Sequence, residues 1–268
     1  MRVGFIGFGE VAYTLSKKLL QNNVEVITST KERSEKTKDL AIDSGVKIIN
    51  SYEEVAKLSD ILISSTSPKT ALAIAKNYGV RTNGTFMDLN NISPETTKKI
   101  ANFFNEKNLN SDFKDRATAG NFVDGAIVGK VSSNNSTILV SGENSDKIAT
   151  LNSYGLKVKV ISEKIGDAST IKMLRSIYTK GLTALIQEAF QAAEHLSLSN
   201  ELFETIAMSE GEKFYFQSKS RLNNLATSKS RKFQEMDEVL NFLKSIYESD
   251  ELEFNSIMSQ ATKNKFKS

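Results

Sequence analysis

Three small residues near the start of the chain, Gly7, Gly9 and Ala12, are spaced as G-x-G-x-x-A between a short apolar run and an amphipathic stretch. A strand, a tight turn and a helix in this order hold a dinucleotide pyrophosphate against the helix N-terminus. The first glycine makes the turn, the second lets the backbone approach the phosphates, and the third small residue lets helix and strand pack closely. Because glycines also fill ordinary strand-to-helix turns, the motif alone is weak. The predicted cofactor contacts here are Gly7, Phe8, Gly9, Glu10 and Val11.

The segments that position this motif alternate between strand and helix. Strand patterns lie at residues 3–6, 24–28, 46–49, 60–66, 85–90, 114–119, 137–141 and 158–161. Helical patterns follow the early strands, at residues 34–45, 51–59, 71–78 and 94–106. Such alternation requires right-handed crossovers, so we expect an α/β fold with a Rossmann-type, doubly wound, mostly parallel sheet. The glycine motif lies where that architecture holds a cofactor, at the carboxyl ends of the strands.

Beyond Ile165 the strand pattern stops and helical periodicity takes over. Helices are predicted at residues 168–196, 200–219, 229–247 and 251–263. We therefore place a domain boundary near residue 164, between a dinucleotide-binding domain at 1–164 and an all-helical substrate and dimerisation domain at 165–268. A single layer of helices leaves apolar faces uncovered, so we expect a homodimer through the helical domain.

Composition excludes several classes of protein. With no cysteine and the single histidine His195, the chain lacks the residues for disulfides, thiol nucleophiles, a histidine triad or a clustered metal site, so we predict no metal. His195 is expected to be a structural or surface residue. The net charge of +3 is scattered, which predicts no nucleic-acid partner but some affinity for a small acidic molecule. Since no apolar run is long enough to cross a bilayer, we expect a cytoplasmic protein without a membrane span or signal peptide.

The residues after the second strand bear on which dinucleotide would bind. NAD-preferring Rossmann domains usually place an acidic residue at this strand end, whereas a nearby arginine accommodates the 2′-phosphate of NADP. Here the strand runs into Ser29, Thr30, Lys31, Glu32 and Arg33. Small hydroxyls followed by Lys31 and Arg33 favour NADP, while Glu32 keeps NAD possible.

Polar residues also end the fourth and fifth strands along the chain. Thr66, Ser67 and Pro68 follow one strand, and Asn90 ends the next. Because the carboxyl ends of parallel strands share one edge, we expect these residues to face the nicotinamide half of the cofactor. Ser67-Pro68 is also a typical helix start, a role that is compatible with binding.

The helix predicted at 168–196 has an apolar face and an adjoining polar face. At about 100° per residue, the apolar face, which we predict to be core, holds Ile171, Leu174, Tyr178, Leu182, Leu185, Ala189 and Leu196. The polar face holds Lys172, Ser176, Thr179, Thr183 and Gln187. Such a polar face is suited to form one wall of a cleft between the domains.

Four stretches resemble the β-hydroxyacid dehydrogenase superfamily, which includes 6-phosphogluconate and 3-hydroxyisobutyrate dehydrogenases. GFIGFGEVAYTLSKKL is similar to its nucleotide fingerprint, and MDLNNISPET to the Asp-Leu-Asn…Ser-Pro segment after its fifth strand. FVDGAIVG at 122–129 stands where the family has a glycine-rich substrate loop, and IGDASTIKMLRS where it has its catalytic-lysine helix. That last run and RKFQEMDEV at 231–239 resemble a little-characterised branch whose C-terminal domain has no assigned function.

The resemblance implies roles for the residues at matching positions. Lys172 would take or give the hydroxyl proton of a carbinol that exchanges hydride with the nicotinamide, and Arg175 would be the cationic neighbour that draws the lysine pKa down. The implied catalytic set is Lys172, Ser176 and Asn90. The implied substrate contacts are Ser93, Asp124, Gly125, Ala126, Lys172 and Arg175, with the 124–129 loop presenting N–H groups to a carboxylate or phosphate, unless its glycines merely shape the loop.

Two departures from the family narrow the substrate. Ser176 stands where many members carry asparagine, and 127–129 reads Ile-Val-Gly instead of Ser-Gly-Gly, which disfavours 6-phosphogluconate and 3-hydroxyisobutyrate themselves. We predict an NAD(P)-dependent dehydrogenase or reductase, with NADP favoured, that acts on a small hydroxy or oxo acid with Lys172 as general acid/base. The alternatives are an imine or pyrroline reductase and a protein that senses a dinucleotide without turnover. Arg231 and Lys232 either start a solvated helix or reach a neighbouring subunit's substrate.

Overall fold

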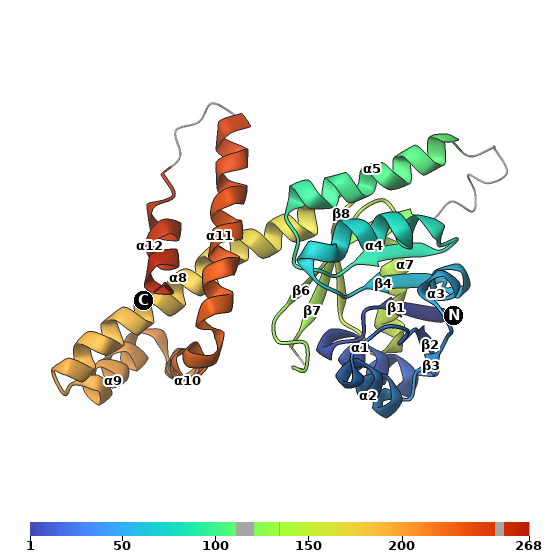
Figure 1. The fold of residues 1–268 in the computed structure, drawn as a ribbon. Helices are drawn as coiled ribbons and strands as arrows, with labels where there is room; N and C mark the ends of the chain where they lie inside the picture. Colours follow the sequence, from blue (N-terminus) through green and yellow to red (C-terminus); the bar gives the residue numbers. More distant parts are fainter. Residues whose placement is uncertain (111–120, 134, 250–254, 268) are drawn as a thin grey trace. The chain divides into compact units, whose positions relative to one another are not determined.

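The structure, a computed structural model, describes residues 1–110, 121–133, 135–249 and 255–267 (Figure 1). It divides into two compact units, Met1–Lys172 and Met173–Ser268. The predicted boundary at 164 precedes the helix that runs from the first unit into the second. The strand predicted at 114–119 lies outside the described residues. Among the helices that the structure describes, none is long and apolar enough to cross a membrane.

The first unit is built on an eight-stranded sheet with the strand order β3-β2-β1-β4-β5-β6-β7-β8. Its strands are β1 Arg2–Ile6, β2 Glu25–Thr28, β3 Lys47–Ile48, β4 Ile61–Ser64, β5 Thr85–Asp88, β6 Asn121–Val128, β7 Thr137–Ser141 and β8 Val158–Ser162. Neighbouring strands are parallel except at β6 and β7, which pair antiparallel. The predicted α/β fold with a doubly wound, mostly parallel sheet is therefore confirmed.

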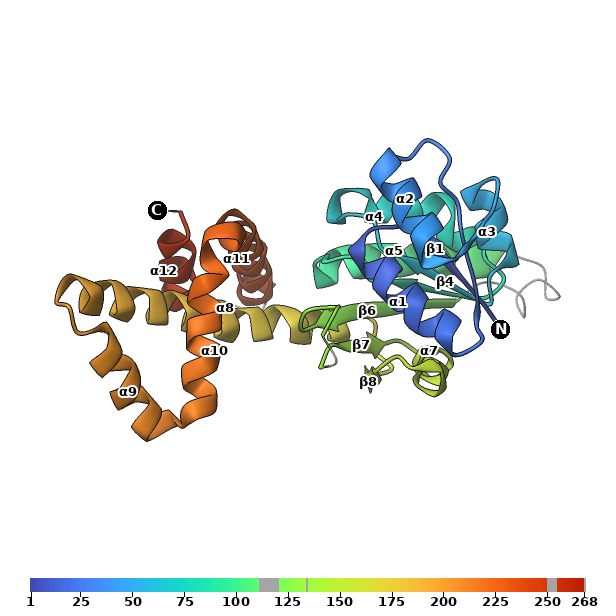
Figure 2. The ribbon, with the colours of Figure 1, turned by 90° about the horizontal axis from the view of Figure 1, so that it is seen from below.

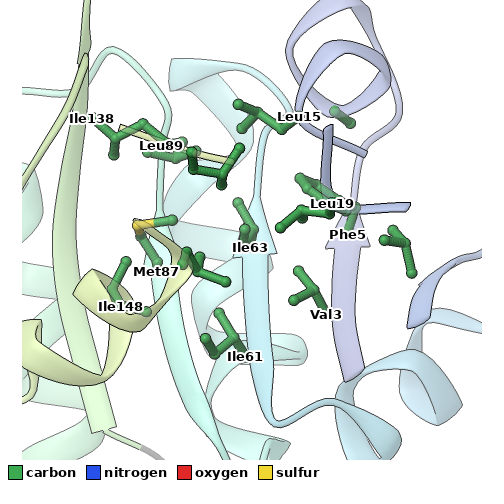
Figure 3. Close-up of a cluster of buried hydrophobic side chains, with 14 of the residues drawn as sticks. Val3, Phe5, Leu15, Leu19, Ile61, Ile63, Met87, Leu89, Ile138 and Ile148 are labelled. Carbon is green, nitrogen blue, oxygen red and sulfur yellow. The ribbon is translucent and has the colours of Figure 1, made fainter. Parts of the chain in front are cut away.

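Helices cover both faces of this sheet. They are α1 Glu10–Gln21, α2 Glu35–Ser44, α3 Tyr52–Leu58, α4 Ala71–Asn77, α5 Pro94–Asn110 and α7 Ser145–Ala149, with short 3₁₀ turns at Pro68–Thr70, Gly79–Arg81 and Thr150–Tyr154. In β4, Ile61 and Ile63 belong to the core beneath α1, α2 and α7, whereas Leu62 belongs to the core beneath α3, α4 and α5. The first of these cores is drawn in Figure 3. Because side chains alternate along a strand, one buried strand supplies apolar residues to both layers.

The second unit is helical. After α8 (Asp167–His195) come α9 Ser199–Glu210, α10 Glu212–Asn223, α11 Leu225–Ser249 and α12 Ile257–Lys265. α9 and α10 form a hairpin, and α11 lies beside α12 (Figures 1 and 2). Met236, Val239 and Leu243 of α11 pack in one core with Ala184 of α8 and Phe266. The single helix predicted at 200–219 is wrong, because the chain breaks at Gly211 (φ 83°, ψ 159°).

The apolar face predicted for α8 is not core in this chain. Tyr178 and Leu185 are 69% and 63% exposed, and Ile171, Leu174 and Leu196 are also exposed. From the predicted polar face, by contrast, Thr183 and Gln187 are buried. The cause is that α8 packs through Ala184 and Ile177 against the α11 core, so its most apolar stripe is left uncovered.

Candidate active site at the carboxyl ends of the strands

The turn between β1 and α1 requires glycine at its first position, Gly7, whereas there is room for a side chain at its second, Gly9. Gly7 has φ +84°, and a Cβ there would lie 2.6 Å from Thr66 Cγ2 and 2.8 Å from the Ser65 carbonyl oxygen. Gly9 is the N-cap of α1, and a Cβ there would meet no described atom within 4 Å. No side chain in the described part of the chain caps this helix. The start of α1 therefore has no side-chain cap and has open space where the side chain of its N-cap residue would lie, as a phosphate site requires.

Tyr52, which the sequence analysis missed, brings a buried hydroxyl to this turn. The hydroxyl has no hydrogen-bond partner among the described residues, and the Gly7 backbone approaches it without completing a hydrogen bond. Burial raises the pKa of Tyr52, and the nearby Arg33 guanidinium opposes that rise. Tyr52 has the local pattern of a helix start after the N-cap Ser51, so only the tertiary structure links it to Gly7 and Arg33.

The segment after β2 exposes its cations. Lys31 and Arg33 are exposed, whereas Ser29 is fully buried. The Ser29 hydroxyl oxygen accepts a hydrogen bond from the Lys31 N–H at 3.4 Å. Glu32 adopts a positive φ of 58° in the turn between them. Two exposed basic side chains, Lys31 and Arg33, and one exposed acid, Glu32, thus follow the end of β2.

The residues after β4 form a capped turn. Pro68 opens a 3₁₀ helix, and Thr70 Oγ1 lies 3.0 Å from both Thr66 Oγ1 and Ser67 Oγ. The Ser67 N–H donates to the same Thr70 oxygen at 3.4 Å. Helix capping is therefore present at Ser67-Pro68, and it fixes Thr66 beside Gly7.

Asn90 belongs to a buried polar network at the end of β5. Its Nδ2 donates to Ser64 Oγ and Asp88 Oδ2, each at 2.8 Å, and its backbone N–H donates to Asp88 Oδ1 at 2.9 Å. Burial raises the pKa of Asp88 to about 6, although hydrogen bonds from Asn90 and Ser64 oppose the rise. The Asn90 amide nitrogen thus fixes the end of β5 against β4.

We expect the Asp88→Asn variant to show a flatter stability profile than the wild type between about pH 4 and pH 6.5. Because the pKa of Asp88 is raised to about 6, the folded state holds a proton that the unfolded state, with a carboxyl pKa near ~3.9, has released. Stability therefore falls as pH rises through this window, by up to about 3 kcal/mol, and asparagine removes that contribution. Urea unfolding at several pH values measures the profile, and parallel curves for the two proteins would contradict the raised pKa.

A second buried carboxylate, Asp124, ties β6 to the first turn of α8. Asp124 Oδ1 accepts from Ser169 Oγ at 2.6 Å, and Oδ2 accepts from the Ser169 N–H at 2.9 Å and from Ser141 Oγ at 3.2 Å. Burial raises the pKa of Asp124, while these hydrogen bonds and the nearby Lys172 ammonium lower it. A carboxylate at a helix N-terminus is favourably placed toward the helix dipole. Asp124 therefore positions the turn of α8 that carries Lys172.

The loop conformation predicted at 124–129 is wrong, because the residues up to Val128 belong to strand β6, while the implied substrate contacts stay a prediction. β6 pairs with β5 only as far as Asp124, whereas Gly125 and Ala126 lie opposite Val140 and Leu139 of β7. The strand ends only at Gly129, which has φ +92°. Aspartate and glycine weaken the strand pattern in the sequence, whereas in the fold Asp124 finds hydrogen-bond partners and Gly125 packs against Leu89.

The sheet register aligns the residues that end these strands. Ile6 lies opposite Ser64, Ser64 opposite Asp88, and Asp88 opposite Asp124. The glycine turn, the Asn90 network and the Asp124 junction with α8 therefore follow one line across the carboxyl edge of the sheet. In an open α/β sheet, this edge is where ligands bind.

Comparison with known proteins assigns the chain to a family. The family model described as "NADP oxidoreductase coenzyme F420-dependent" matches residues 2–87, a range that includes the glycine turn. An uncharacterised 28.5 kDa protein of Methanothermus fervidus is 41% identical over 267 residues, covering 100% of this chain and 98% of the relative. A solved structure of a conserved protein of unknown function, described as structurally similar to 3-hydroxyacid dehydrogenases, has 36% identity and a TM-score of 0.80, covering 100% of this chain and 96% of that one. The chain belongs to the β-hydroxyacid dehydrogenase superfamily.

More distant solved structures share the fold of this superfamily member. The 3-hydroxyisobutyrate dehydrogenase of Salmonella typhimurium has 15% identity and a TM-score of 0.76, covering 100% of this chain and 93% of that one. An imine reductase from Pseudomonas sp. has 16% identity and a TM-score of 0.63, covering 91% of this chain and 86% of that one. At these identities the likeness shows a shared fold.

The remaining residues that the sequence predicts for the site lie on α8 or at the start of α5. Lys172 is half-buried in the first turns of α8, and Arg175 is exposed one turn later. Ser176 Oγ accepts a hydrogen bond from Lys180 Nζ at 3.0 Å. Ser93 caps α5 by accepting from the Thr96 N–H at 3.2 Å. Ser93 and Ser176 thus have structural partners of their own.

One predicted cofactor contact, Phe8, has its side chain in the core of the first unit. The Phe8 ring is buried and packs edge-on against Phe5, with ring centroids 6.2 Å apart. Only the Phe8 backbone can therefore contribute to the turn. His195 is exposed at the end of α8, and no group of three metal-ligating side chains occurs among the residues that the structure describes.

Proposed function

We propose that this superfamily member is an NADP-dependent dehydrogenase or reductase that moves hydride between the cofactor and a small acid bearing a hydroxyl or oxo group. One observation carries the proposal: Asp124 holds the N-terminus of α8 at the carboxyl edge of the sheet, through two hydrogen bonds from Ser169. That junction fixes Lys172 at the edge where the glycine turn also opens. A proton-transferring amine and a phosphate-binding turn on one edge are what such chemistry needs.

The residues of the glycine turn fit a dinucleotide. Gly9 leaves open space at the uncapped start of α1, and Tyr52 contributes a buried hydroxyl without a partner among the described residues. We infer that the backbone at Gly7–Val11 holds the pyrophosphate and that Lys31 and Arg33 bind the 2′-phosphate of NADP. When bound, the nicotinamide cofactor supplies or accepts the hydride.

Lys172 would handle the proton at the substrate oxygen. Its Nζ would take the hydroxyl proton when an alcohol is oxidised and return it when a carbonyl is reduced. Asp124 acts as a positioning residue through the α8 turn that Ser169 joins to it and through its charge near Lys172. Arg175, one turn further along α8, adds a positive charge suited to an acidic substrate.

We expect calorimetric titration of the purified chain to give at least tenfold tighter binding of NADPH than of NADH, a difference of about 1.4 kcal/mol. The reason is that Lys31 and Arg33 offer two cations to the 2′-phosphate. A Lys31→Ala/Arg33→Ala double variant should bind both cofactors about equally, whereas the exposed Lys36→Ala control should keep the NADPH preference. Tighter NADH binding by the wild type would overturn the NADP assignment.

A panel of hydroxy and oxo acids, assayed with the preferred cofactor, tests the reaction itself. Turnover of a member of the panel supports the proposal. Reduction of cyclic imines without activity on any acid would favour an imine or pyrroline reductase, and tight cofactor binding without any turnover would favour a dinucleotide sensor. If neither cofactor binds at millimolar concentration, the oxidoreductase proposal fails.

A further inference from the structure

The helical unit contains a polar cavity of about 220 Å³ between α8, α10 and α11. Three of the lining side chains are cations, Lys180, Arg221 and Lys232. The others carry hydroxyl or amide groups, among them Thr179, Ser220 and Asn224. All of these residues belong to Met173–Ser268, so the cavity is complete within one unit.

Each of the three cations contacts a neighbouring polar group. Arg221 Nη1 donates to the Thr179 carbonyl oxygen at 3.2 Å, which joins α10 to α8. Lys180 Nζ lies 2.5 Å from Glu235 Oε2 and 3.0 Å from Ser176 Oγ. Lys232 Nζ contacts Ser228 Oγ. The cations therefore line the cavity from three helices, α8, α10 and α11.

Positive charge around the cavity exceeds negative charge. Glu235 lies against Lys180, but it also contacts Arg231 Nε at 3.6 Å, so it is shared between two cations. Burial lowers the pKa of both Arg221 and Lys232, and neighbouring cations, Arg175 for one and Arg231 for the other, lower them further. Clustered cations at such a site repel one another until an anion joins them.

We propose that this cavity binds a phosphate group, either as inorganic phosphate or as the phosphate of a small metabolite. Lys180, Arg221 and Lys232 together with Glu235, the acid that contacts Lys180, sum to a charge of +2, and a phosphate monoester carries about −1.5 to −2 at pH 7 with three acceptor oxygens. The Arg221 guanidinium has five N–H donors in a planar fork that suits phosphate oxygens. A carboxylate, with one charge and two oxygens, would leave part of the positive charge unneutralised and some of the N–H donors without an acceptor.

Calorimetric titration of the full-length chain with inorganic phosphate tests the proposal. We expect Arg221→Gln and Lys232→Gln each to raise the phosphate Kd at least fivefold relative to the wild type. The matched control is Lys213→Gln, which removes the same charge from an exposed position on α10 and should change the Kd less than twofold. Circular dichroism confirms that each variant is folded. Should Arg221→Gln fail to fold after losing its contact with α8, Lys232→Gln carries the test alone.

Three results would overturn the proposal. The wild type fails to bind phosphate at about 10 mM, all the variants bind it as the wild type does, or malonate binds as tightly as phosphate. The test needs neither cofactor nor turnover, so its failure is separate from failure of the proposed oxidoreductase function. Repeating the substrate panel with phosphorylated and unphosphorylated acids then distinguishes the two sources: a substrate phosphate changes KM in Lys232→Gln, whereas free phosphate acts without competing with substrate.

Discussion

Replacing Lys172 with methionine is expected to lower kcat by about 10²- to 10⁴-fold, on the acid that the wild type turns over best, while the cofactor Kd stays within twofold. The methionine keeps the length of the side chain but removes the amine that exchanges the proton. Lys172 is half-buried and lies one turn after Ser169, which Asp124 anchors. We therefore expect the substitution to leave the helix in place. Steady-state kinetics and calorimetry on the same preparation measure both quantities.

The matched control for this prediction is Lys159→Met, an exposed lysine on β8 of the same unit. It should retain wild-type kcat. A Lys172→Met variant with more than a tenth of wild-type kcat would show that another group transfers the proton, and it would favour the imine reductase alternative. Loss of cofactor binding together with activity would instead indicate that Lys172 acts on the dinucleotide.

Asp124→Asn separates positioning from proton transfer. An asparagine oxygen still accepts from Ser169 but lacks the charge near Lys172 and the start of α8. If Asp124 acts only through the placement of Lys172, this variant has a smaller kcat loss than Lys172→Met and a shifted pH profile. The smaller kcat loss is expected because Asp124 acts on the reacting atoms through Lys172, whereas Lys172 itself transfers the proton.

Much of the first unit could be predicted because its signals are local. The Ser51 hydroxyl accepts from the Glu54 N–H as a helix cap, and Gly45 ends α2 in the left-handed conformation. Strand β6 escaped prediction because Asp124 and Gly125 break the apolar pattern. Only residues distant in sequence, Ser141 and Ser169, make a buried aspartate tolerable there. The same limitation applies to Tyr52, whose relation to Gly7 no sequence spacing reveals.

The apolar stripe of α8 shows where periodicity gives a face but not its partner. The hydrophobic pattern correctly marks Tyr178 and Leu185 as one stripe, yet both are exposed because the α11 core packs on a different side of α8. A pattern in one sequence does not distinguish a face covered by the same chain from one covered by a second copy. The homodimer therefore stays a prediction.

Gly9→Val is expected to abolish detectable cofactor binding at millimolar concentration without loss of stability. For a wild-type Kd in the micromolar range this is about a 10³-fold loss, or about 4.1 kcal/mol. Gly9 has an extended backbone with a negative φ (φ −101°, ψ −161°), which does not require glycine, and no described atom lies within 4 Å of its Cβ position. The added side chain would therefore occupy only the space that we assign to the pyrophosphate. Calorimetry measures binding, and thermal unfolding measures stability.

Gly7→Ala is the contrasting variant, because its Cβ would meet the protein instead of the ligand. At φ +84°, with Thr66 Cγ2 at 2.6 Å and the Ser65 oxygen at 2.8 Å, alanine is strained and should destabilise the fold by about 1 to 3 kcal/mol. Binding and stability should thus fall together in Gly7→Ala but separate in Gly9→Val. Normal cofactor affinity in Gly9→Val would mean that the dinucleotide binds elsewhere, and the opening glycines would then serve only the packing of β1, α1 and the Thr66 turn.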